Sequence, residues 1–126
     1  MPHRTADPST LALQALAAEE KFLPLGLYSG AKPEELRVRL QQLVDALLVE
    51  LAALAPHDRT KEQVLEQFRS TLASVGTVDS EEKEQICTYL ERIMDILGLE
   101  SSDGLLNNWL YGFDLDALLR TRASEA

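Results

Sequence analysis

The sequence predicts an all-α fold: a compact helical bundle of three principal helices, at about 33–55, 61–75 and 80–97, with short N- and C-terminal helices. Apolar residues recur every three or four positions in each long segment, as on the buried face of a helix. Residues that favour helix starts precede these segments, and proline or glycine follows them. With 126 residues, one core is feasible, so we expect a single helical domain at 10–122 between loose tails at 1–9 and 123–126.

Two elements are expected before the first principal helix. A weak helical stretch runs from Thr10 to about Glu20. The segment from Phe22 to Gly30 then mixes large apolar residues with Pro24 and Gly26, which oppose a helix. We expect an ordered extended strap whose apolar side chains are buried.

The first principal helix is expected to start at Pro33, where a missing N–H costs nothing, and to stop at Pro56. Its leucines form one continuous stripe: Leu36, Leu40, Leu43, Leu47, Leu51 and Leu54. The apolar surface widens in the second half through Val44, Leu48 and Val49. A helix that is apolar on most sides belongs in the middle of a bundle.

The second principal helix should open with a capping box, in which Thr60 caps the amides and Gln63 reaches back. Its buried face would be Val64 or Leu65, then Phe68, Leu72 and Val75, and Gly76 ends it. The third should open with Asp79 and Glu82 as a similar pair. Its buried face would be Ile86, Leu90, Ile93 and Leu97, and a left-handed Gly98 followed by Leu99 would close it.

On the third principal helix, an acidic stripe lies almost opposite Ile93 and Leu97 at about 100° per residue. It consists of Glu84, Glu91 and Asp95, and we treat these residues as a candidate partner surface, the acidic face. The region from Asp79 to Asp103 holds eight acids against Lys83 and Arg92, which is −6 of a total net charge of −9. Such a surface repels a phosphate backbone, so we expect no nucleic acid and favour a basic protein partner.

The segment from Ser101 to Phe113 mixes aromatic residues with amides. Its short helix would bury Leu105, Leu106, Trp109 and Leu110, and Asp114 could cap a last turn with Leu115, Leu118 and Leu119. A candidate ligand site or polar cluster remains: Asp103, Asn107, Asn108 and Tyr111. Binding surfaces favour such residues, but a small core uses aromatic groups with a polar tip as well, and we favour the structural interpretation.

We find no catalytic, metal or cofactor site in the sequence. His3 is in the tail and His57 in a turn, and neither has a second histidine at helical spacing. Cys87, the only cysteine, excludes an internal disulfide and is expected to be a small core residue. Two carboxylate pairs, Asp114 with Asp116 and Glu91 with Asp95, match caps and solvated faces as well as a cation site.

A membrane span and a leader are both unexpected. The longest apolar run, 43–55, is interrupted by Asp45 and Glu50, whereas a span needs about 20 apolar residues. The apolar run at 11–18 is short, contains Gln14 and follows Asp7 where a leader would carry positive charge. We therefore expect a cytoplasmic protein.

The C-terminal third resembles a known family. The run from Tyr89 to Gly104, with Glu100-Ser-Ser-Asp-Gly104, then Asn108-Trp109 and Tyr111-Gly-Phe113, is similar to the signature of small bacterial helical proteins catalogued as a domain of unknown function. The resemblance extends over about Phe22 to Asp114. It implies a compact helical domain and transfers no activity. Members often carry a secretion or lipoprotein leader, which implies a periplasmic location for them.

Three hypotheses for function follow. The first is a non-catalytic acidic interaction protein that binds or neutralises a basic partner, such as a toxin. The second is a small hydrolase or ligand-binding domain that uses the Asp103 to Tyr111 region. The third is a purely structural subunit, and a homodimer is compatible with all three.

Overall fold

The computed structural model describes residues 7–111, and within them the chain forms five α-helices. These are α1 (Pro8–Ala18), α2 (Glu34–Ala53), α3 (Lys61–Ala73), α4 (Ser80–Leu97) and α5 (Leu105–Tyr111). A short 3-10 helix, η1 (Pro56–Asp58), joins α2 to α3. The predicted all-α class is confirmed, and the only strand-like pairing in this part of the chain is the bridge between Leu25 and Tyr28. None of the described helices is both long enough and apolar enough to cross a membrane.

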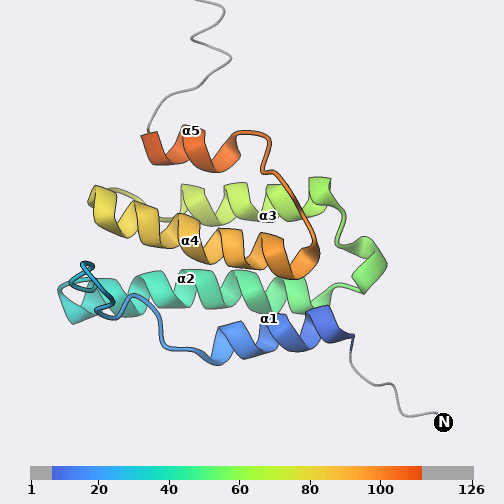
Figure 1. Ribbon diagram of the computed structural model, residues 1–126, viewed down its shortest axis with the longest axis horizontal. Helices are drawn as coiled ribbons and strands as arrows, with labels where there is room; N and C mark the ends of the chain where they lie inside the picture. Colours follow the sequence, from blue (N-terminus) through green and yellow to red (C-terminus); the bar gives the residue numbers. More distant parts are fainter. Residues whose placement is uncertain (1–6, 112–126) are drawn as a thin grey trace, which may run out of the picture.

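The helices lie side by side, and each runs opposite to the one before it (Figure 1). α1 packs against α2 and α4, whereas α5 packs against α3 and α4. The N-terminus of α4 therefore lies at the same end of the bundle as the connection between α1 and α2, and its C-terminus lies near η1 (Figure 1).

One hydrophobic core joins all five helices. Its fully enclosed members come from every principal helix: Leu40, Leu48, Leu51, Val64, Phe68, Leu90 and Ile93. The expected face of α3 is buried, with both Val64 and Leu65 taking part, and so is that of α4 except Leu97, which is only partly buried. The prediction that the buried apolar surface of α2 widens to include Val49 is wrong, because the Val49 side chain is 62% exposed.

The N-terminal helix differs from the expected Thr10–Glu20. It begins at Pro8, because the Asp7 carboxylate accepts hydrogen bonds from the backbone N–H groups of Ser9 at 3.0 Å and Thr10 at 3.3 Å. Residues 7–9, expected in the tail, are thus part of the helix and its cap. The C-terminal turn expected at Asp114 to Leu119 and the tail at 123–126 lie outside the described residues.

The two predicted capping boxes have different outcomes. Thr60 accepts from the backbone N–H of Gln63 at 3.2 Å, as expected for the N-cap of α3, but the Gln63 side chain does not reach back to Thr60, so only half of this box is formed. Asp79 occupies the N-cap of α4, but its side chain makes no capping bond. Its expected partner Glu82 is buried instead and accepts from the Tyr28 hydroxyl at 3.5 Å, so the cap pair predicted at α4 is wrong.

The C-terminus of α4 is closed as the sequence predicts. Gly98 has φ 73°, in the left-handed region that favours glycine, and the backbone N–H of Leu99 donates to the Met94 carbonyl at 2.9 Å. This closure turns the chain back across the last turn of α4.

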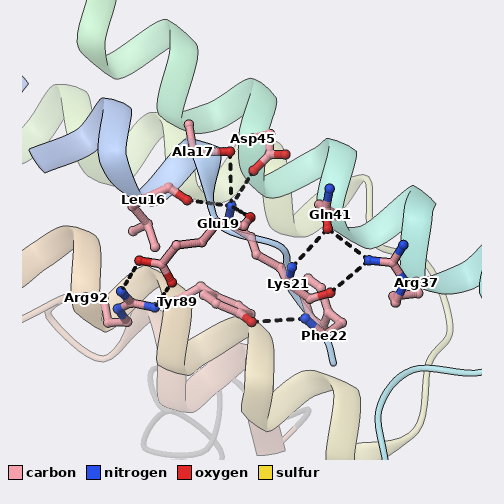
Figure 2. A network of polar contacts seen from close by, with 10 residues as sticks. All are labelled: Leu16, Ala17, Glu19, Lys21, Phe22, Arg37, Gln41, Asp45, Tyr89 and Arg92. Carbon is pink, nitrogen blue, oxygen red and sulfur yellow. Dashed lines mark hydrogen bonds and ion pairs between the residues drawn. The ribbon is translucent and has the colours of Figure 1, made fainter. Parts of the chain in front are cut away.

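A buried lysine joins α1 to α2 (Figure 2). The Lys21 side chain is fully buried, and its amine donates to the carbonyl oxygens of Leu16 at 2.6 Å and Glu19 at 2.9 Å. It also forms an ion pair with Asp45 of α2 at 2.6 Å. The lysine therefore caps the C-terminus of α1, where the helix dipole favours a cation.

Arg59 has the same role at the C-terminus of α2. Its guanidinium donates to the carbonyl oxygens of Leu51, Ala52 and Leu54, at 2.8 to 3.1 Å. It also donates to the Thr10 hydroxyl at 2.7 Å, which connects this end of α2 to α1.

Candidate functional site

The acidic face of α4 is exposed along its whole length. Glu84, Glu91 and Asp95 all lie in solvent, opposite the buried Ile93. At 1.5 Å per residue, Glu84 and Asp95 lie about 16 Å apart along the helix axis. None of these three carboxylates forms an ion pair with a cation among residues 7–111.

The two basic residues of α4 contact other elements. Arg92 donates two hydrogen bonds to the Glu19 carboxylate, at 3.0 and 2.8 Å, and the Arg92 guanidinium holds the pKa of Glu19 below its usual value. The Lys83 amine lies 5.5 Å from the centroid of the Trp109 ring on α5. Both basic residues of α4 are thus engaged with other elements, and neither forms an ion pair with the acidic face.

An open cleft of about 360 Å³ lies between the C-terminal half of α4 and the start of α5. We call it the α4–α5 cleft. Its polar lining consists of Glu91, Asp95, Glu100, Ser101, Ser102 and Asn107, and its apolar lining of Met94, Leu99 and Leu106. Three carboxylates thus border one concave surface that also has an apolar part.

The loop at 99–104 shapes this cleft. The Ser101 hydroxyl accepts from the backbone N–H of Asp103 at 3.0 Å, and the Ser102 hydroxyl accepts from the backbone N–H of Leu106 at 3.3 Å. Asp103 has φ 55°, which is unusual for a residue with a side chain, and Gly104 follows it with φ 86°. The first bond lies within the loop, and the second ties the loop to the first turn of α5.

The structure separates the four residues of the predicted polar cluster. Asn107 lines the cleft together with Glu91 and Asp95. Asp103 lies outside it and pairs with Lys61 of α3 at 2.8 Å. Asn108 is half-buried beside Gly104, and Tyr111 is 67% exposed at the end of α5. Two residues of the acidic face, Glu91 and Asp95, and one member of the polar cluster therefore form a single site.

Glu84 lies away from that cleft. It borders a second groove of about 340 Å³, at the N-terminal end of α4, together with Glu81, Gln85, Leu25, Leu27 and Tyr28. The acidic face thus connects two concave surfaces at opposite ends of one helix.

The groups with nucleophilic or basic potential lie elsewhere. Cys87 is buried, and burial, with smaller effects from Glu91 and Glu84, raises the pKa of its thiol to about 11. His57 is exposed in η1, 3.5 Å from Asp58, and His3 lies outside the described residues. Within residues 7–111, no three His, Cys, Asp or Glu side chains are placed to hold a metal ion together. The chemistry that the cleft offers is attraction of a cation.

Sequence reasoning missed two parts of this surface. The first is Glu100, which contributes to the predicted charge and to the signature but is not predicted to line a site; two residues after Gly98, it lies in the lining of the α4–α5 cleft. The second is the pair Leu25 and Leu27: the prediction that the strap buries its apolar side chains is wrong for these two residues, which are 77% and 105% exposed. Only the ends of this segment, Phe22 and Tyr28, are buried, and residues 23–27 between them are all exposed.

Comparisons with known proteins show the family. The model of the family described as Domain of unknown function (DUF4844) matches residues 4–114. Among solved structures, the chain is similar to a DUF3571 family protein from Acinetobacter baumannii AYE, with 33% sequence identity and a TM-score of 0.76, over 88% of this chain and 94% of that chain. A search of curated proteins gives no match. The resemblance predicted from the sequence is confirmed, and the chain belongs to the DUF4844 family of domains of unknown function.

Proposed function

We propose that this protein is a non-catalytic interaction protein that binds a basic segment of a partner protein along the acidic face of α4. The observation that carries the proposal is the α4–α5 cleft, where Glu91, Asp95 and Glu100 border one open surface without a cation from residues 7–111.

The lining of the cleft suits a lysine or arginine side chain. Such side chains have an apolar stem and a charged end, and they cover apolar surface while the charge stays at a polar site. The stem would pack on Leu99, the least buried apolar residue of the lining, and the cation would reach Glu91 and Asp95. The side-chain carbonyl oxygen of Asn107 would accept one further hydrogen bond from the cation. Arginine fits best, because its planar guanidinium donates two parallel hydrogen bonds to a single carboxylate.

The expected energy is modest. Exposed ion pairs contribute about 0.2–1 kcal/mol each, so three carboxylates supply about 0.6–3 kcal/mol. Their main effect is on the rate of association, because complementary charge steers the encounter and is screened by salt.

The hypothesis of a ligand-binding domain is supported less well. Of the polar cluster, only Asn107 borders the cleft, and Asp103 is already paired with Lys61. A small cationic ligand in the cleft would depend on Asn107, Glu91 and Asp95 but not on the distant Glu84. A protein segment would depend on Glu84 as well, so this residue discriminates between the two.

The experiment compares two triple variants. The first, Glu84→Gln/Glu91→Gln/Asp95→Asn, neutralises the acidic face. The control, Glu35→Gln/Glu50→Gln/Glu62→Gln, removes the same charge from exposed positions of α2 and α3. Partners captured by the wild-type protein are identified by mass spectrometry, and their association kinetics are measured at about 50 mM and about 300 mM NaCl.

We expect a basic partner whose association slows about tenfold with the first variant and with salt, and much less with the control. The proposal would be contradicted by a partner whose association rate changes neither with ionic strength nor with the first variant.

We further propose a cytoplasmic location, because the single cysteine is a free buried thiol, as is common in reducing compartments.

A further inference from the structure

The loop at residues 22–31, between α1 and α2, has exposed leucines at its tip, and its two ends are bonded to each other and to the bundle. At this base the backbone N–H of Ala31 donates to the Phe22 carbonyl at 3.0 Å. Phe22 is buried, its ring centroid lies 5.0 Å from that of Tyr89, and its backbone N–H donates to the Tyr89 hydroxyl at 3.0 Å. Figure 2 shows this contact beside the Lys21 network. The two ends of the loop are therefore held on the bundle.

The tip of the loop is also fixed. Leu25 and Tyr28 exchange two backbone hydrogen bonds of 2.9 Å, which makes a tight turn with Gly26 at φ 58°. Tyr28 is buried and donates its hydroxyl to Glu82 of α4 at 3.5 Å. The loop is thus closed at both ends, as in compact surface loops that have their own packing.

This closed loop presents three leucines to solvent: Leu23 is 42% exposed, Leu25 77% and Leu27 105%. Single exposed leucines are common on protein surfaces, but a contiguous apolar patch with a polar rim is typical of an interaction site. Here Leu25 and Leu27 border the groove with Glu81 and Glu84 of α4. The apolar patch therefore adjoins the acidic face.

We propose that the Leu25–Leu27 turn is the apolar anchor for a basic amphipathic helix of the partner protein, which lies along α4. The inference rests on the proposed function and adds the apolar half of the recognition. The helix would place apolar residues on Leu25 and Leu27 and basic residues opposite Glu84, Glu91 and Asp95. A segment of about 11 helical residues covers the roughly 16 Å between Glu84 and Asp95.

Charge selects this occupant over a second copy of the chain or a membrane. A second copy carries a net charge of −9, and a symmetric contact at the turn would bring Glu81 and Glu84 toward their equivalents. Anionic lipid headgroups would be repelled in the same way. A basic helix with an apolar stripe matches both parts of the surface, and the anchored loop lowers the entropy cost of binding.

The test uses two synthetic peptides of about 14 residues, long enough to cover the acidic face as a helix. One is helical with lysines on one face and leucines on the other, and the second has serines in place of the leucines at equal charge. Binding is measured by fluorescence anisotropy for the wild-type protein and for Leu25→Ser/Leu27→Ser. The matched control is Leu11→Ser/Val49→Ser, which removes apolar groups exposed by 49% and 62% on α1 and α2. Circular dichroism checks that each variant is folded.

We expect the wild-type protein to bind the lysine–leucine peptide about 30-fold more tightly than the lysine–serine peptide. Leu25→Ser/Leu27→Ser should lose this preference, and the control should keep it. If Leu25→Ser/Leu27→Ser binds the lysine–leucine peptide as tightly as wild type, the anchor is refuted. Failure of the proposed function looks different, because binding of both peptides would then be insensitive to Glu84→Gln/Glu91→Gln/Asp95→Asn.

Two further outcomes would overturn the choice of occupant. Leucine-dependent binding to phosphatidylcholine vesicles would make the turn a lipid-binding element. Leucine-dependent dimerisation, measured by sedimentation, would make it a contact between copies of this chain.

Discussion

Replacing Lys21 by methionine tests why a lysine is fully buried between α1 and α2. Methionine fills much of the same volume but donates no hydrogen bond. The variant therefore leaves the Leu16 and Glu19 carbonyl oxygens without their donor and Asp45 without its cation. α1 would lose the cap at its C-terminus as well as its polar connection to α2.

The magnitude follows from the burial of the two partners. Breaking a fully buried ion pair costs about 3–5 kcal/mol, and one unsatisfied buried acceptor costs about 1–3 kcal/mol. Asp45 is 27% exposed, so water recovers part of its solvation. We expect Lys21→Met to lower the free energy of unfolding by about 3 kcal/mol, toward the lower end of the range for buried pairs.

Urea denaturation followed by circular dichroism measures this loss. With a slope of about 2 kcal/mol/M, the midpoint should fall by about 1.5 M. Lys61→Met is the control, because its pair with Asp103 is exposed and should contribute less than about 1 kcal/mol. Adding Asp45→Asn to Lys21→Met should restore part of the loss, since no buried charge is then unpaired. A midpoint for Lys21→Met within about 0.3 M of wild type would refute the reasoning.

Three further predictions concern the core, the end of α4 and pH. Leu90→Asp should prevent folding, because it places an unpaired charge at a fully buried position; a cooperative wild-type-like melt would contradict the assigned core. Gly98→Ala should cost about 1 kcal/mol, because φ 73° is unfavourable for alanine, and thermal melts would detect it. Because the pKa of Cys87 is raised, the thiol stays protonated to a higher pH in the folded state than in the unfolded state. The free energy of unfolding should therefore fall as pH rises from about 9 toward 11. Cys87→Ala should reduce this fall in urea midpoints at alkaline pH, and an unchanged pH profile would show that the thiol contributes nothing.

The elements that the sequence marks at both ends are predicted best. The helix expected at 80–97 matches α4, because Asp79 and Gly98 flank a clear apolar period. α2 ends at Ala53, earlier than expected, since Leu54 and Ala55 are extended before Pro56. The residue before a proline avoids helical geometry, and the expected boundary ignored this effect.

Buried cations were not predictable from local patterns. Lys21 and Arg59 lie next to helix ends. Charged residues at such positions are usually exposed to solvent, so a local pattern predicts exposure for both. Their burial depends on how α1, α2 and the following turns come together, and no spacing rule contains this information. The start of α1 is predictable from local sequence, because Asp7 followed by Pro8 is an ordinary N-cap signal, and the expected tail at 1–9 leaves this signal unused.

The candidate site was predictable in part. Helical periodicity places Glu84, Glu91 and Asp95 on the outer face of α4, and all three are exposed. The cleft depends instead on the path of residues 99–104, with a left-handed Asp103, and therefore on contacts that the sequence does not display. For the same reason, Asn107 could not be separated in advance from Asn108 and Tyr111.

The most direct test of the acidic face as a binding surface is an NMR titration of the ¹⁵N-labelled protein with the lysine–serine peptide. We predict amide shift changes concentrated at residues 81–95 and 99–107, which are lost at about 500 mM NaCl. They should also be lost in Glu84→Gln/Glu91→Gln/Asp95→Asn but remain in Glu35→Gln/Glu50→Gln/Glu62→Gln. Shift changes spread over α2 and α3, or equal in the two triple variants, would contradict the claim that α4 carries the binding surface.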